Sequence, residues 1–316
     1  MPEVITIGET MVVFDSTTAG PLRYASAFTC HTGGAETTVA VGVVRQGHSA
    51  GWISRVGEDE FGRKLIQTFR GEGVDVSRVE TDPDRNTGIF FRESVGNGEY
   101  RNTYYRSSSA FSAIRPDMLD EDYIRSAQYL MVSGITLAVN PSAAATARRA
   151  MEIAKAAGGK VCFDPNLRLK MWTVEEARRT MEALWPMVDI ALPGVDEGAL
   201  LFGLKEPDSI AAHLQNAYGI ETVVVKTGPD GAVGYQKGQR TASLGFPAKV
   251  VDAFGAGDSF CAGILTGFLE GWPLERTLQY ANAIGSMVVS RPGNIEAIPD
   301  RRQVEAFLQG RGGITR

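Results

Sequence analysis

Cysteine and histidine are scarce in this sequence, with three of each among 316 residues. Cys30, Cys162 and Cys261 are odd in number and far apart, which excludes a disulfide framework and favours a reducing compartment such as the cytoplasm. The three histidines show no spacing typical of a zinc site. We also find no Cys/His or Ser/His/Asp arrangement that would indicate nucleophilic catalysis.

Long apolar runs and basic tracts are also missing. No apolar segment approaches the ~20 residues of a membrane span, and the start of the chain lacks the charged segment and apolar core of a signal peptide. Lysine and arginine number 32 against 37 acidic residues, a net charge of −5. We therefore expect a cytoplasmic protein with neither a nucleic-acid nor a membrane partner.

Glycine, by contrast, is abundant, at 36 residues and well above the usual ~7%. Short β-branched segments alternate with longer amphipathic ones, which predicts an α/β fold with a mainly parallel sheet covered by helices. The expected strands are 4–7, 129–132, 161–164, 190–192, 222–225 and an antiparallel 232–235. The expected helices are 36–46, 61 to about 71, 142–157, one from the Thr173–Glu176 capping box, 258–269, 274–289 and 301–308.

The pattern changes between about residues 81 and 112. Residues 89–92, a Gly96-Asn97-Gly98 turn and residues 101–106 predict a β-hairpin, because Asn-Gly favours a two-residue turn. We find no internal repeat and no flexible linker, so we predict one domain over residues 1–316. A small β lid is expected from about residues 9–32 and 81–112.

The segment Gly255-Ala256-Gly257-Asp258 precedes an amphipathic helix. Bare backbone N–H groups at the positive end of a helix form a cradle for an anion. Asp258, beside that cradle, is placed to accept a proton from a hydroxyl, as phosphoryl transfer requires. The alternative is that the glycines only form a turn and that Asp258 only favours the helix dipole.

Three other segments follow expected strands, where parallel sheets bind ligands. Asn166 and Arg168 are candidate site residues, or else parts of a solvated loop. Lys226 is suited to nucleotide phosphates, or is only solvated. Glu197 is suited to metal-bound water, or simply caps a helix. On the expected lid, Tyr104 and Arg106 share one face of a strand.

These motifs resemble those of the ribokinase-like (PfkB-type) sugar kinases over nearly the whole chain. The resemblance rests on Gly33-Gly34-Ala35-Glu36, Val225-Lys226-Thr227-Gly228 and Val251-Asp252 through Asp258. Within that family the chain is most similar to the kinases of 2-keto-3-deoxygluconate. The similarity rests on Gly8-Glu9-Thr10, Tyr104-Tyr105-Arg106, Ser133-Gly134-Ile135-Thr136, Asp164-Pro165-Asn166-Leu167-Arg168 and Trp172.

The resemblance implies a three-layer α/β/α fold with a β-sheet lid, and ATP and Mg²⁺ at the site. Asp258 matches the family's catalytic base, and Gly255, Ala256 and Gly257 match its anion hole. The positions implied to contact the sugar acid are Gly34, Phe90, Tyr104, Arg106 and Arg168. The nucleotide side would comprise Lys226, Gly228, Gly231, Gly257 and Asn282.

The family's magnesium motif is only partly present. Gly194 stands in place of its asparagine, which leaves Glu197 as the one implied metal residue. A monovalent cation near Asp252 is left open. The open edges of a β lid also favour pairing between subunits, so a homo-oligomer is expected.

The sequence thus predicts ATP-dependent phosphorylation of the terminal hydroxyl of 2-keto-3-deoxygluconate. Arg106 and Arg168 suit a carboxylate, and a neutral sugar would leave a buried arginine unpaired. Alternatives are a kinase for fructose or 2-keto-3-deoxygalactonate, or a sugar-binding regulatory protein without turnover. A dinucleotide-dependent oxidoreductase is excluded, because Gly8-Glu9-Thr10-Met11 is no dinucleotide fingerprint.

Overall fold

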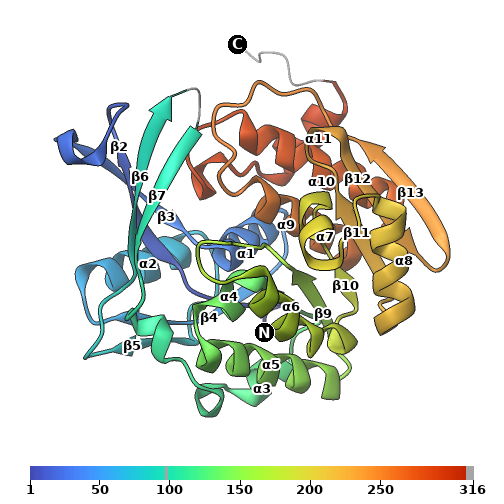
Figure 1. The fold of residues 1–316 in the computed structure, drawn as a ribbon, viewed down its shortest axis with the longest axis horizontal. Coiled ribbons are helices and arrows are strands. Elements are labelled where there is room, and N and C mark those ends of the chain that lie inside the picture. The colour runs from blue at the N-terminus through green and yellow to red at the C-terminus, as the bar shows by residue number, and fades with distance from the viewer. Residues whose placement is uncertain (97–98, 311–316) are drawn as a thin grey trace.

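A nine-stranded sheet lies between two layers of helices in the computed structural model, which describes residues 1–96 and 99–310 (Figure 1). Neighbouring strands are parallel, except that β12 runs antiparallel to both β11 and β13. The strand order is β13 (Gln239–Leu244), β12 (Gly231–Gln236), β11 (Thr222–Lys226), β10 (Ile190–Ala191), β9 (Lys160–Asp164), β8 (Tyr129–Ser133), β1 (Val4–Ile7), β4 (Ala50–Gly57) and β5 (Val79–Asp82).

Each face of the sheet has its own hydrophobic core. Successive strand residues point to opposite faces, so Val4 of β1 packs into one core and Ile5 into the other. The first core lies under α1 (Ala35–Arg45), α2 (Glu60–Gly71), α9 (Ala256–Leu269), α10 (Leu274–Val289) and α11 (Arg301–Leu308). The second lies under α3 (Glu121–Arg125), α4 (Gly134–Val139), α5 (Pro141–Ala156), α6 (Val174–Glu182), α7 (Val195–Phe202) and α8 (Pro207–Tyr218).

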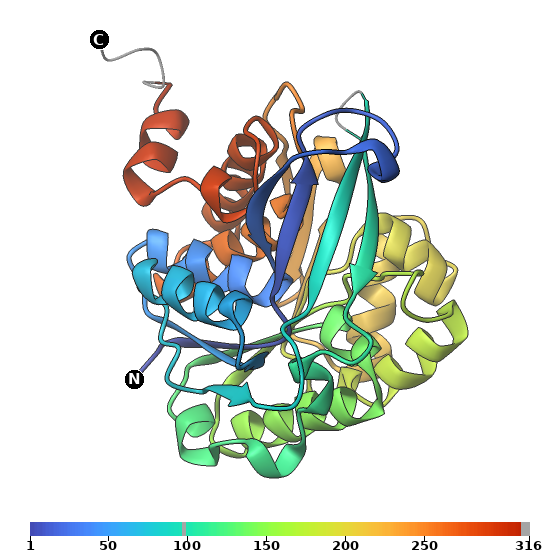
Figure 2. The ribbon, with the colours of Figure 1, turned by 90° about the vertical axis from the view of Figure 1, so that its left-hand side faces the viewer.

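A second, four-stranded sheet stands over one end of the first, and we call it the lid (Figure 2). Its strand order is β3 (Phe28–Gly33), β2 (Met11–Ser16), β6 (Ile89–Gly96) and β7 (Glu99–Tyr105). Met11, Val13 and Phe90 form a small core on the inner face of the lid. This core packs against Phe254, which belongs to the nine-stranded sheet and its helices, together called the body. The lid is therefore packed against the chain just before α9.

Helix α9 is placed by close contacts with its neighbours. A Cβ atom added at Gly42 of α1 would lie 2.5 Å from the Cβ of Ala262, so glycine is needed where α1 and α9 meet. Nine of the residues of α9 are buried, and the helix starts at the edge of the sheet that faces the lid. The position of its N-terminus is therefore fixed by the core.

The structure confirms the α/β sheet, the helices and the hairpin expected from the sequence, with the Asn97-Gly98 turn lying outside the described residues. The lid strands span residues 11–33 and 89–105, and therefore fewer residues than expected. Residues 79–82 form β5, which pairs with β4 of the main sheet, and residues 110–113 form a 3₁₀ helix beside β4. Among the described residues, no helix has the length and apolar character to cross a membrane.

Candidate active site

Two cavities meet at Asp258, at the carboxyl ends of the parallel strands. The lid cavity has a volume of about 520 Å³ and lies between the lid and the body. The loop cavity has a volume of about 430 Å³ and is bounded by the loops that follow β9, β10 and β11. Arg168, Ala253, Gly255 and Asp258 line both. A group in one cavity can therefore approach a group in the other beside the Asp258 carboxylate.

The chain enters α9 through a left-handed turn at Gly255, whose φ is 76°. An added Cβ there would lie 2.0 Å from Oδ1 of Asn294, so both the backbone conformation and the space require glycine. The N–H groups of the first helical turn have no acceptor within a helix. Those of Gly257 and Asp258 are therefore available to an anion beside the two cavities.

Asp258 itself is partly accessible from the cavities and otherwise surrounded by protein. Burial, and after it the charge of Asp164, raise the pKa of its carboxyl to about 6, against the opposite effects of Arg168 and Lys226. Asn166 donates a hydrogen bond from Nδ2 to Oδ1 of Asp258 at 3.0 Å. The side chain is thus held in place with a pKa that suits a base near neutral pH.

The loop after β9 presents Asn166 to Asp258 in a strained conformation. The φ of Asn166 is 37°, in the left-handed region. Asp164 accepts hydrogen bonds from the backbone N of Asn166 at 3.1 Å and from Nζ of Lys226 at 2.8 Å. The Lys226 ammonium, expected to meet nucleotide phosphates, is therefore engaged with Asp164 and supports this loop from the edge of the loop cavity.

Glu197 supports the same loop from the other side. Its Oε1 accepts a hydrogen bond from the backbone N of Leu167, and its Oε2 accepts one from Gly194, both at 2.7 Å. Burial raises the pKa of its carboxyl. The described residues contain no group of three or more acidic, histidine or cysteine side chains that could hold a metal ion. Glu197 caps α7 through the hydrogen bond from Gly194, and its expected metal role stays a prediction.

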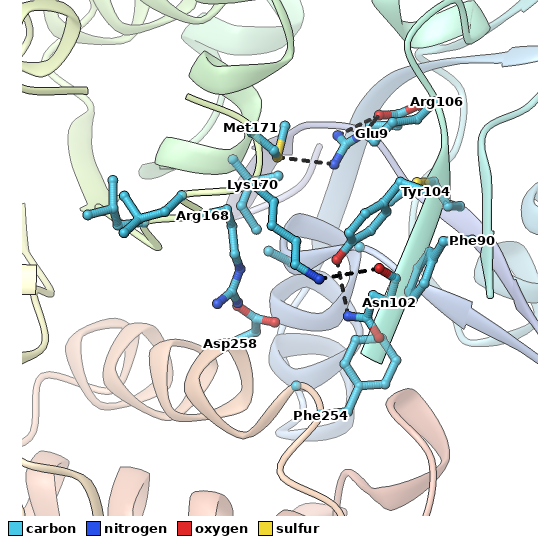
Figure 3. A pocket seen from close by; sticks show the side chains of 18 of the residues that line it. Glu9, Phe90, Asn102, Tyr104, Arg106, Arg168, Lys170, Met171, Phe254 and Asp258 are labelled. Atoms are coloured by element: carbon cyan, nitrogen blue, oxygen red, sulfur yellow. Dashed lines mark hydrogen bonds and ion pairs between the residues drawn. The ribbon is translucent and has the colours of Figure 1, made fainter. Parts of the chain in front are cut away.

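Basic side chains gather in the lid cavity, as Figure 3 shows. Arg106 of the lid reaches Oε2 of the buried Glu9 through Nε at 2.7 Å and Nη2 at 2.5 Å. Arg168 forms no ion pair among the described residues and extends toward Asp258. Lys170 donates a hydrogen bond to the backbone O of Asn102 at 3.3 Å and has no carboxylate partner in the described chain.

This arrangement corrects one step of the sequence argument. A neutral ligand would not leave Arg106 unpaired, because Glu9 already balances its charge. The cavity cations without a carboxylate partner in the described chain are instead Arg168 and Lys170, and both side chains are exposed, so neither is the buried arginine that was expected. Sequence reasoning missed Glu9, Lys170, Asn102 and Phe254 as cavity residues, although Lys170 lies two positions after Arg168 on the same loop.

The other expected site residues divide into two groups. Gly34, Phe90 and Tyr104 line the lid cavity, where the Phe90 and Tyr104 rings lie 5.0 Å apart. The residues that line the loop cavity are Lys226, Gly228, Glu197 and Gly257. Two residues expected on the nucleotide side, Gly231 and Asn282, line neither of these cavities.

Both of these residues have structural partners. Gly231 begins β12 with a φ of 105°, and an added Cβ would lie 2.2 Å from the backbone O of Ser243. Asn282 of α10 is buried and donates hydrogen bonds from Nδ2 to the backbone O atoms of Ser243 and Leu244 at 3.0 and 3.2 Å. Gly231 thus lets β13 lie close to β12, and Asn282 binds the end of β13 to α10.

Glu36, at the start of α1, is a buried carboxyl that sequence reasoning did not single out as a site residue. Its Oε1 accepts hydrogen bonds from Ser133 at 2.6 Å and from Thr136 at 2.7 Å. Burial raises its pKa to about 7. Glu36 thus ties the Gly33-Gly34 turn to the end of β8, without lining either cavity.

Residues 1–301 match the family described as pfkB family carbohydrate kinase. The chain belongs to this family. It is 35% identical over 315 residues to the 2-dehydro-3-deoxygluconokinase of Bacillus subtilis (strain 168), covering 97% of this chain and 95% of that protein. It is 34% identical over 313 residues to the Thermoproteus tenax enzyme of the same name, covering 98% and 95%. An Arabidopsis thaliana protein named fructokinase-7 is also 34% identical, covering 96% and 92%.

Solved structures agree with this membership. A PfkB protein from Polaromonas sp. JS666 superimposes with a TM-score of 0.89 at 34% identity, covering 97% of this chain and all of that one. An E. coli protein described as a ribokinase II, in complex with ATP and Mg²⁺, gives 0.92 at 28% identity, covering 98% and 100%. This PfkB-family protein is therefore a carbohydrate kinase, an enzyme that transfers a phosphoryl group to an alcohol.

Proposed function

We propose that this kinase phosphorylates the terminal hydroxyl of 2-keto-3-deoxygluconate, the compound also called 2-dehydro-3-deoxygluconate, with ATP as the donor. The observation that carries the proposal is the position of Asp258, where a cavity with unpaired cations meets a cavity at the start of α9. Two relatives at 34–35% identity are named for this substrate. A sugar acid suits the lid cavity because Arg168 and Lys170 can pair with its carboxylate.

In this proposal Asp258 takes the proton of the sugar hydroxyl as the hydroxyl oxygen attacks the γ-phosphorus of ATP. The bond from the γ-phosphorus to the bridging oxygen breaks, and ADP leaves with that oxygen. The N–H groups at the start of α9 are placed to stabilise the charge on the transferring phosphoryl group. Asn166 keeps the Asp258 carboxylate oriented throughout.

ATP would lie in the loop cavity, beside Gly228 and the start of α9. Each oxygen of Glu197 already accepts one backbone hydrogen bond, so Glu197 is better suited to hold metal-bound water than to ligate Mg²⁺ directly. Mg²⁺ is usually held by phosphates, waters and one or two carboxylates. We therefore propose that Mg²⁺ binds with the ATP phosphates.

The monovalent cation expected near Asp252 gains no support, since both oxygens of Asp252 accept hydrogen bonds from Arg92.

A substrate panel tests the proposal. With ATP and Mg²⁺, we expect kcat/KM for 2-keto-3-deoxygluconate to exceed that for fructose or ribose by roughly 10- to 100-fold, the worth of one charge-assisted hydrogen bond. A coupled ADP-release assay with 2-keto-3-deoxygalactonate in the same panel compares the two epimers. Faster turnover of fructose or ribose than of either acid would contradict the proposal.

Fructose phosphorylation is the second candidate, because a relative named as a fructokinase is 34% identical and Arg106 needs no substrate carboxylate. A regulatory protein without turnover is disfavoured by the raised pKa of Asp258, which suits a base.

The expected homo-oligomer and the expected cytoplasmic location stay predictions. Sedimentation velocity and cell fractionation would test them, with a monomer or a membrane-bound protein as the contradicting results.

A further inference from the structure

Arg92, on lid strand β6, joins carboxylates from the two parts of the molecule. Its side chain is only 4% exposed. Its guanidinium donates two parallel hydrogen bonds to Asp252, from Nη2 to Oδ1 at 2.8 Å and from Nη1 to Oδ2 at 2.9 Å. Nη1 also donates to Oδ2 of Asp15 on β2 at 3.1 Å. Asp15 belongs to the lid, whereas Asp252 lies in the body, six positions before Asp258.

Two aromatic rings flank the same guanidinium. Tyr100 of the lid has its ring centroid 3.8 Å from the Arg92 Cζ, and Phe254 of the body has its centroid at 4.5 Å. Phe254 also meets Phe90 of the lid edge to face, with centroids 6.2 Å apart, and lines the lid cavity. Such contacts fix the planar group in orientation as well as in position.

The carboxylate that Arg92 holds also shapes the loop before α9. Oδ1 of Asp252 accepts a hydrogen bond from the backbone N of Phe254 at 3.0 Å, which closes a turn over residues 252–254. The next residue is Gly255, whose left-handed conformation starts the helix that carries Asp258. A shift of Asp252 would therefore reach the backbone N–H groups of the anion cradle within a few residues.

The position of Asp252 depends in turn on the lid. Asp252 is buried, with a side chain 5% exposed. A buried carboxylate that loses its partner is strongly destabilised. If the lid moved away from the body, Asp252 would lose Arg92 and Phe254 would lose Phe90, so the loop would be free to leave the shape described here.

We propose that Arg92 is a positioning residue that couples the position of the lid to the geometry of the anion cradle. The anion cradle, formed by the backbone N–H groups at the start of α9, is correctly placed only when the lid brings Arg92 into contact with Asp252. Closure of the lid over the sugar therefore also places the groups that stabilise the transferring phosphoryl group. This proposal rests on the proposed function for its catalytic consequence. Its structural part, the dependence of residues 253–257 on Arg92, does not.

The variants Arg92→Lys and Asp252→Asn test the coupling from the lid and from the body. Lysine keeps the charge but lacks the planar fork that satisfies Asp252 and Asp15 together. Asparagine keeps the acceptor for the Phe254 N–H but removes the charge. The control is Arg101→Lys, on the same hairpin, where Arg101 is 70% exposed and pairs with Glu93 at 3.3 Å. Thermal unfolding identifies the variants that fold.

Two measurements decide the outcome, and at least one of the two variants is expected to fold. Misplacing catalytic groups by about 1 Å can cost 100-fold in rate, so we expect kcat to fall roughly 30- to 100-fold while KM for the sugar stays within about threefold. Amide hydrogen exchange at Phe254 and Ala256, whose N–H groups donate to Asp252 and Ala253, should accelerate at least about tenfold, while exchange within residues 262–269 of α9 stays unchanged. Arg101→Lys should change neither quantity.

Unchanged exchange at Phe254 and Ala256 would overturn the coupling, and so would faster exchange with an unchanged kcat. A rise in KM alone would also overturn it, because it would assign Arg92 to sugar binding. If the wild-type protein phosphorylates no sugar, the proposed function fails. The exchange measurement then decides by itself whether Arg92 controls the loop.

Discussion

Replacing Asp258 with asparagine is expected to lower kcat about 1,000-fold, within the range that general-base catalysis contributes. Asparagine has nearly the same shape and can still accept the hydrogen bond from Asn166, which is 3.0 Å long in the wild type. It cannot take the proton of the sugar hydroxyl. Steady-state kinetics at saturating ATP and sugar acid measure the loss.

Binding separates this result from a loss of fold. Calorimetry should show that Asp258→Asn binds the sugar acid with an affinity within a few-fold of the wild type, because Arg168 and Lys170 are untouched. Asp208→Asn is a matched control, since Asp208 lies on α8 and pairs with Arg240 at 2.8 Å. A variant at position 258 that keeps more than a tenth of the wild-type kcat would show that another group takes the proton.

Replacing Arg168 with glutamine is expected to raise KM for 2-keto-3-deoxygluconate roughly 10- to 100-fold, the loss of one hydrogen-bonded charge pair. Arg168 has no carboxylate partner in the described chain, so its charge is available to the ligand. It also lowers the pKa of Asp258. The variant should therefore need a higher pH for its full kcat/KM.

The neutral sugars supply the control for this variant. KM for fructose should change little in Arg168→Gln, because fructose has no carboxylate to lose a partner. Lys170→Gln should raise KM for the acid less, since Lys170 already donates a hydrogen bond to the backbone O of Asn102 and its ammonium cannot form the planar fork of an arginine. Equal losses for fructose and for the acid would mean that Arg168 shapes the cavity and does not select the acid.

Local sequence signals predicted the helices and the centre of the sheet well. Helix α10 begins and ends at the expected residues, because apolar residues recur along it and Pro273 precedes it. No individual strand was predicted for β2, β3, β4, β5 or β13, although β2 and β3 fall within the segment expected to form the lid. Three of the six residues of β3 and four of the six of β13 are exposed, and an edge strand has little apolar alternation to reveal it.

The site was predictable where its residues lie together in the sequence. Gly255 to Asp258 form one segment, and Arg168 follows a clear strand. The pairing of Glu9 with Arg106 joins residues 97 positions apart, and that of Arg92 with Asp252 joins residues 160 apart. Such pairs depend on how the lid packs against the body. No local spacing indicates them, which is why the sequence argument took Arg106 to be unpaired.

The dependence of kcat/KM on pH tests the role of Asp258 most directly. Its pKa is raised to about 6, so the neutral form prevails below that pH and the base form above it. We expect kcat/KM for the sugar acid, which reports the ionisation of the free enzyme, to be level above about pH 7 and to approach a tenfold loss per pH unit below about pH 6.

Glu36 supplies the control, because its pKa is also raised, to about 7, yet it lines neither cavity. The variant Glu36→Gln should keep the acid limb near pH 6. A wild-type profile that stays flat from pH 5 to pH 8, or a limb that disappears in Glu36→Gln, would contradict the assignment of the base to Asp258.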